Sequence, residues 1–387
     1  MPYLVMSGLL WGTGGLTGTL LGRAAGLPGL SVAAYRLATG GALIVGFLLV
    51  TRRRWPAGRA AWTRITVIGL LAAVFQSCYF TAVSITSVSL ATLLTIGSAP
   101  VIVLAAERLT GRLTGGCRPG RHAAATTGLA LAGLGLLVGL PGGGYPETAV
   151  LASAGLAVLS GAGFATMTLV GARPVAGLDD LTATGFGFTL GGLVLLPLAA
   201  AAGRLAFTPQ PATIGLLIAL GTGPTAVAYP LYFRGLRAAT PSAAALLALL
   251  EPLTGTILAV VLLGNRLSGT GIAGAVLLGA AVASTVRTTR GSADGLADHG
   301  GGPVQDDRAQ RQQHGEGLPD HRAGERAGGQ RPGCGHRVVE RVEVREHPHP
   351  GRAEGDRQQH PTEQQDRQVE PVDDRGETAD IPAHLAG

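Results

Sequence analysis

Ten apolar segments follow one another up to about residue 290, and they constrain the fold more than any other feature of the chain. Crossing the hydrocarbon core of a bilayer takes about 20 mostly apolar residues in a helix. Backbone groups find no hydrogen-bond partners in lipid, so a spanning segment must satisfy its own. The sequence therefore predicts an all-α integral membrane protein with ten transmembrane helices, near 3–22, 30–50, 65–83, 88–107, 123–140, 149–171, 181–202, 211–233, 241–263 and 269–286.

The composition changes after Arg290. Before this residue the acidic side chains are only Glu107, Glu147, Asp179, Asp180 and Glu251. Residues 291–387 are rich in Gly, Arg, Gln, Asp and Glu and are nearly free of aromatic residues, so they cannot bury a core. We predict a disordered polar tail over 291–387. A G/C-rich gene read in another frame gives the same composition, and this second hypothesis stays open.

The arginines predict the orientation in the membrane. If the N-terminus is cytoplasmic, the inner loops hold most of the arginines, and the outer loops hold only Arg23, Arg204 and Arg266. The positive-inside rule favours this orientation over its opposite. We therefore expect a multi-pass protein of the plasma membrane with cytoplasmic N- and C-termini.

Two stretches of the chain resemble each other. Residues 89–114 and 241–268 each contain an Ala/Leu run, a proline, an aliphatic stretch and then Arg-Leu followed by a hydroxyl residue, with Pro100 aligned to Pro252 and Arg112 to Arg266. The copies are five helices apart, so the second half is inverted relative to the first. Inverted repeats are typical of secondary transporters. The expected division is residues 1–140, 141–290 and the tail 291–387.

The chain resembles the EamA family of the drug/metabolite transporter superfamily. The resemblance covers about residues 1–287 and is carried by LLWGT (9–13), AAYRLATGG (33–41), the segment from Cys78 to Ile102, the segment from Gly223 to Leu253, and LLGNRLSGTG (262–271). It implies a ten-helix carrier that exports, or less often imports, small metabolites, commonly amino acids or drugs.

Glu251 is a carboxylate in the middle of an apolar segment, where a charge costs at least ~2.5 kcal/mol on insertion scales. Pro252 follows it, and the first copy has Ala99 and Pro100 instead. Each proline is predicted to open its helix, since it removes a backbone donor. Glu251 beside an opened turn could bind a substrate amine or carry a proton across. Alternatively, it is neutral or paired and joins two helices.

Arg36 is the second charge that lies deep in an apolar segment. Its long side chain could reach the interface or make a structural bond between helices. The alternatives are a pair with Glu251 or a contact with a substrate carboxylate.

Further polar and aromatic residues are candidates for the wall of the same cavity: Trp11, Gln76, Tyr79 and Tyr229. Polar side chains inside a bilayer usually face the bundle interior. Packing is the alternative for each of them, and Tyr232 is close enough to a helix end to be an interface anchor.

Small residues at four-residue spacing predict close helix contacts. Gly135 and Gly139 form such a step in the fifth helix, and Gly271, Ala275 and Gly279 form two in the tenth. Packing within one chain is expected, with a homodimer as the alternative.

Enzymatic, metal-binding and nucleic-acid-binding functions are not expected. No paired nucleophile and base lie within the helices, and Cys78, Cys117 and Cys334 have no partners at metal-ligand spacing. The net charge of +6 is the sum of a basic first part and an acidic tail. We expect no cofactor and no nucleic acid. The predicted partners are a small-molecule substrate and the lipid bilayer. A non-transporting scaffold or sensor is the competing class.

Overall fold

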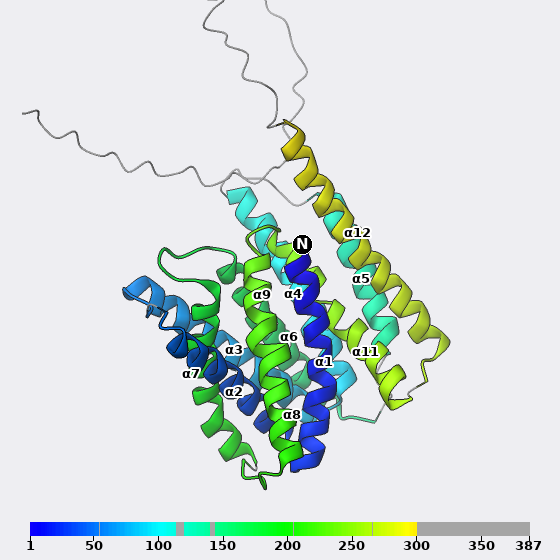
Figure 1. Cartoon of the computed structure of the whole chain (residues 1–387). Helices are drawn as coiled ribbons and strands as arrows, with labels where there is room; N and C mark the ends of the chain where they lie inside the picture. Colours follow the sequence, from blue (N-terminus) through cyan, green and yellow to red (C-terminus); the bar gives the residue numbers. More distant parts are fainter. Residues whose placement is uncertain (54, 114–119, 140–143, 204, 265, 300–387) are drawn as a thin grey trace, which may run out of the picture. The chain divides into compact units, whose positions relative to one another are not determined.

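The computed structural model describes residues 1–299 except 54, 114–119, 140–143, 204 and 265 (Figure 1). The chain divides into two units, Met1–Gly335 and His336–Gly387, and every described residue belongs to the first. Most of the predicted tail lies outside the described residues. Its predicted start at 291 is too early, because the last helix continues to His299.

The described residues form helices, with β structure limited to one isolated bridge between Val175 and Leu178. The elements are α1 (Pro2–Ala25), α2 (Gly29–Val50), α3 (Arg59–Ile85), α4 (Val88–Leu113), α5 (Arg121–Val138), α6 (Glu147–Gly171), α7 (Asp180–Ala202), α8 (Pro211–Gly221), the π-helix η1 (Thr222–Val227), α9 (Ala228–Gly235), α10 (Pro241–Leu247), α11 (Leu250–Leu263) and α12 (Gly269–His299).

Ten spans in the described part of the chain are long and apolar enough to cross a membrane, which confirms the prediction. The eighth span consists of α8, η1 and α9, and the ninth of α10 and α11. Large apolar side chains within the spans are exposed on the bundle surface, among them Phe47, Leu151, Leu193, Val261 and Val276. Such a surface would be costly in water and suits lipid. The protein is an all-α, multi-pass membrane protein.

We call the side of the bundle where α1 begins the N-side and the opposite side the far side. Successive spans alternate in direction, so α1 and α12 run opposite ways in Figure 1. On the N-side, α2, α4, α6 and α9 end, and α3, α5, α7 and α10 begin. On the far side, α1, α3, α5, α7 and α11 end.

Proline interrupts the eighth span, and the backbone compensates locally. Pro224 has no N–H to donate to the Leu220 carbonyl, which is four residues earlier. The Thr225 hydroxyl donates to this oxygen instead, at 3.0 Å, inside η1. The chain therefore makes one wide π turn here, and π turns are frequent at functional sites.

The ninth span is broken before Pro252. The Ala248 carbonyl lacks the proline N–H that would normally reach it, and the N–H of Glu251 donates to it at 3.0 Å. This tightened turn separates α10 from α11. Pro100 differs, because α4 runs unbroken through it from Val88 to Leu113. The prediction that Pro100 opens its helix is wrong, because the helix continues through the proline and tolerates the missing donor.

Helix crossings of the two halves match one another. In the α2–α7 crossing, a Cβ on Gly41 would meet Thr189, and a Cβ on Gly192 would meet Ala38. Aligning Gly41 with Gly192 also aligns Ala38 with Thr189, so each of these two contacts is the counterpart of the other. The α5–α12 crossing is equally symmetric. A Cβ on Gly133 would meet the Gly274 carbonyl, and a Cβ on Gly274 would meet the Gly133 carbonyl.

The contacts of α1 with the ninth span correspond to those of α6 with α4. A Cβ on Gly8 would meet the Leu247 carbonyl and the Leu250 side chain, whereas one on Gly161 would meet the Thr95 carbonyl and the Ser98 side chain. Aligning Pro100 with Pro252 pairs these same positions, Thr95 with Leu247 and Ser98 with Leu250. The packing therefore supports a repeat that divides the chain near residue 140.

The prediction that Gly135 and Gly139 form the packing face of α5 is wrong. A Cβ on Gly135 would meet no atom within 4 Å, and Gly139 ends the helix with a φ of 78°. The contact with α12 is made by Gly133, two residues earlier, where an added Cβ would lie 2.6 Å from the Leu278 nitrogen.

We expect Gly133→Ala to lower the unfolding free energy by about 1–3 kcal/mol, because the added methyl group forces α5 and α12 apart. Gly135→Ala is the matched control and should be neutral or slightly stabilising, since alanine favours helix more than glycine does. Unfolding of the two purified variants in detergent checks this. Equal stability of the two would contradict the crossing described here.

Candidate functional site

A cavity of about 810 Å³ lies within the bundle. Its lining comes from α1, α2, α3, α4, α8 and α11, together with Val138 at the end of α5. Along α1 the lining begins at Trp11, near the middle, and reaches Arg23, near the far side. The volume is within the range of about 300–1,000 Å³ typical of small-molecule sites. The cavity thus extends from mid-bundle to the far side.

Most of the predicted site residues line this cavity: Trp11, Arg36, Gln76, Tyr79, Glu251 and Pro252. They come from four spans, the first three and the ninth. Tyr229 lies behind the wall, with its ring 4.9 Å from that of Trp11. Pro100 is in α4 and is not one of the lining residues.

Arg36 joins the cavity wall to the π turn of the eighth span. Its Nε donates to the Thr225 hydroxyl at 3.1 Å, and its Nη2 donates to the Pro224 carbonyl at 3.2 Å. The side chain therefore makes the structural bond between helices that the sequence left as one of several alternatives. A guanidinium has five N–H donors, so donors remain for another partner.

Glu251 lies in the wall at the break between α10 and α11. Its charge interacts with that of Arg36, but within the described part of the chain no ion pair joins the two. No described residue donates a hydrogen bond to its carboxylate either. The helix-joining pair considered for Glu251 is therefore not seen, and the carboxylate has its binding capacity unused.

Polar side chains of α3 and α4 complete the wall. Gln76 is only 2% exposed, and the Tyr79 hydroxyl shares a hydrogen bond of 2.9 Å with Thr92. Thr95, also in the lining, donates to the Ala157 carbonyl of α6 at 3.1 Å. These groups fix α3, α4 and α6 around the cavity and give its wall hydrogen-bonding character.

An aromatic cluster closes the cavity toward the N-side. The Trp11 ring lies 5.8 Å from Phe164, 4.9 Å from Tyr229 and 4.9 Å from Tyr232. The Tyr232 hydroxyl shares a hydrogen bond of 2.9 Å with Thr168, and the residue is 1% exposed. The alternative that Tyr232 is an interface anchor is therefore wrong, since its ring belongs to the buried core.

Trp11 also has an unpaired donor. Among the described residues, no group accepts a hydrogen bond from its buried indole N–H. Buried donors are usually satisfied, so this one marks the cavity floor as a place where an acceptor would be stabilised.

Sequence reasoning missed two groups that shape the site. Phe164 belongs to the cluster on the floor, and Thr225 holds both Arg36 and the π turn. Phe164 could have been found by aligning the halves, since it corresponds to Trp11 when Gly161 is aligned with Gly8. Nothing in the local sequence distinguishes Thr225 from neighbouring threonines.

Comparisons with known proteins agree with this architecture. A model of the EamA-like transporter family matches residues 1–139 and 151–287. The uncharacterized transporter YwfM of Bacillus subtilis (strain 168) is 28% identical over 280 residues, which cover 71% of this chain and 90% of YwfM. Protein PecM of Dickeya dadantii (strain 3937) is 33% identical over 151 residues, 38% of this chain and about half (48%) of PecM.

A crystal structure of a protein with 20% sequence identity resembles this fold with a TM-score of 0.61. The match covers 73% of this chain and 96% of the other. At this identity the likeness concerns the fold alone.

We expect Thr225→Val to lower the unfolding free energy by about 1.5–3 kcal/mol, because Arg36 loses an acceptor and the Leu220 carbonyl loses its donor. Thr222→Val is the matched control, since Thr222 lies in the same π-helix with an exposed side chain. Denaturation of both variants in detergent measures the difference. An equal effect of the two substitutions would show that Arg36 is not anchored as described.

Proposed function

Because the chain belongs to the EamA-like transporter family, we propose that it is a secondary carrier that moves a small metabolite across the plasma membrane by alternating access. The observation that carries the proposal is the cavity, which reaches one side of the bundle and is closed at mid-depth by the Trp11 cluster. A path open to one side at a time is what alternating access requires. A non-transporting scaffold has no need for such a cavity.

The lining favours a small substrate with both a cationic and an anionic or acceptor group. The Glu251 carboxylate can bind an amine, and the remaining Arg36 donors and the Trp11 N–H can bind acceptor atoms. The aromatic floor offers apolar contact. Amino acids, related metabolites and drugs of similar size share this chemistry, and we propose them as the substrate class.

Glu251 also supports proton coupling. An ionisable side chain inside a membrane that faces a cavity is a typical proton carrier in transporters. The absence of a described partner leaves this carboxylate free to exchange a proton with whichever side the cavity faces. We propose that a proton and the substrate compete for it.

Because the arginine distribution favours this orientation, we propose that the N-side faces the cytoplasm, with both ends of the bundle there. The cavity then faces the outside, and the structure corresponds to an outward-facing state. We propose export as the direction of transport, as the family resemblance implies. Uptake through the same fold is the alternative. Because the family relationship is to transporters, we propose no catalytic role.

We expect Glu251→Gln to abolish net transport while leaving membrane insertion intact, because the amide neither titrates nor binds an amine as an ion pair. Cells that express the intact protein should show a small set of metabolites with an increased ratio of extracellular to intracellular amount. Cells with Glu251→Gln should lose this increase, and metabolite profiling of both fractions measures it.

Glu147→Gln is the control, since Glu147 is an exposed residue in the first turn of α6. It should retain the wild-type profile. If Glu251→Gln transported the same metabolites at the same rate, neither the coupling role nor the binding role of Glu251 would stand.

A further inference from the structure

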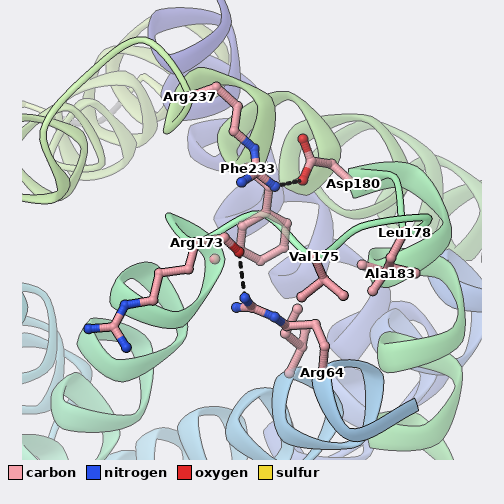
Figure 2. A pocket seen from close by; sticks show the side chains of 10 residues that line it. Arg64, Arg173, Val175, Leu178, Asp180, Ala183, Phe233 and Arg237 are labelled. Carbon is pink, nitrogen blue, oxygen red and sulfur yellow. Dashed lines mark hydrogen bonds and ion pairs between the residues drawn. The ribbon is translucent and has the colours of Figure 1, made fainter. Parts of the chain in front are cut away.

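Polar contacts hold the N-side ends of four spans together. The Arg64 guanidinium, on α3, donates to the carbonyl oxygens of Val170 and Arg173 at the end of α6 and just beyond it. Arg237, which follows α9, forms an ion pair with Asp180 at the start of α7. Figure 2 shows the bond from Arg64 to the Arg173 carbonyl and the Arg237–Asp180 pair around one small pocket. We call Arg64, Asp180, Arg237 and the two carbonyls the N-side cluster.

The N-side cluster leaves no passage. The pocket that it encloses measures about 10 Å³, about the space of a single water molecule. Phe233 lines this pocket and packs against Tyr232 with ring centroids 6.0 Å apart. Tyr232 in turn contacts Trp11 at the cavity floor. A continuous packed layer therefore separates the cavity from the N-side, with the N-side cluster as its outermost part.

Among the described residues, the repeat has no matching cluster on the far side. Aligning Gly41 with Gly192, as the α2–α7 crossing does, places Gly29 opposite Asp180, and each is the first residue of its helix. Aligning Gly69 with Gly221, which make equivalent crossings, places Leu216 opposite Arg64 and Ile85 opposite Arg237. Gly29 lines the cavity, and Leu216 packs in an apolar cluster. The polar contacts that close the N-side thus have apolar counterparts on the far side, where the cavity extends.

We propose that the N-side cluster is a lock that favours the state open to the far side, and that opening to the N-side requires it to break. The proposal rests on the alternating-access function proposed above. If two inverted halves were identical, the two open states would be equal in energy. A contact that forms in only one of the two states favours that state, and the shift in population corresponds to the free energy of the contact. The N-side cluster is such a contact set, since its counterparts cannot re-form it on the other side.

The test measures accessibility and needs no substrate. Two reporter cysteines are placed separately in full-length protein that carries Cys78→Ser, Cys117→Ser and Cys334→Ser. Ser89→Cys lies in the cavity lining, and Ala183→Cys lies in the lining of the small pocket, where alanine is 6% exposed. Reaction rates with a membrane-impermeant maleimide are compared in nanodiscs, where both sides of the protein are accessible.

Asp180→Asn should raise labelling at Ala183→Cys and lower it at Ser89→Cys, so that the ratio of the two rates changes by about two- to five-fold, the factor that corresponds to a partly exposed ion pair. Arg64→Gln should act in the same direction. The charge reversal Asp180→Arg with Arg237→Asp should restore the original rates.

Arg234→Gln is the matched control, because it removes an N-side arginine that stacks on Tyr3 outside the cluster. It should change neither rate. Unchanged rates in Asp180→Asn and Arg64→Gln would overturn the lock. A parallel rise at both reporters would also overturn it, since it indicates loosening rather than a change of state. If the wild-type protein moved no metabolite while Asp180→Asn still changed the two rates in opposite directions, the proposed function would be rejected and the lock would stand.

Discussion

Backbone polar groups inside a bilayer must be satisfied within the protein, and the cavity region is organised by the way this chain meets that requirement at its prolines. Pro224 removes the donor for the Leu220 carbonyl, and Thr225 replaces it. The carbonyl of Pro224 is itself bound by Arg36. In the next span, Pro252 frees the Ala248 carbonyl, which takes the N–H of Glu251. Repairing the two interruptions fixes both charges of the cavity in place.

The spans and the repeat could be predicted from the sequence because their signals are periodic and extensive. Ten apolar segments exceed what a soluble core needs, and the alignment of Pro100 with Pro252 corresponds to contacts that the structure repeats. Most of the candidate cavity residues could also be predicted, since a polar side chain in an apolar span usually faces the interior of the bundle. Glu251 and Arg36 are the clearest cases.

What the sequence could not give depends on helix rotation and on tertiary distance. Whether Gly133 or Gly135 faces α12 is a matter of two residues, about half a turn, and both lie in the same run of small residues. Tyr232 is near a helix end in the sequence, yet its ring lies in the core and its hydroxyl shares a hydrogen bond with Thr168. In the N-side cluster Arg64 lines the same small pocket as the Asp180–Arg237 ion pair, and no local pattern brings these residues together.

The chemistry of this fold lies where the two halves differ. Glu251 corresponds to Ala99, and Arg36 corresponds to Gly187, whose added Cβ would lie 3.2 Å from the Ile65 carbonyl in a close crossing with α3. At these positions one half has charged side chains that line a cavity, whereas the other half has small residues that are packed between helices. Asp180 reverses the pattern, because its counterpart Gly29 lines the cavity. Equivalent crossings supply a common frame that two arrangements can share. In the proposed mechanism, the unmatched charges decide which arrangement is populated and what the cavity binds.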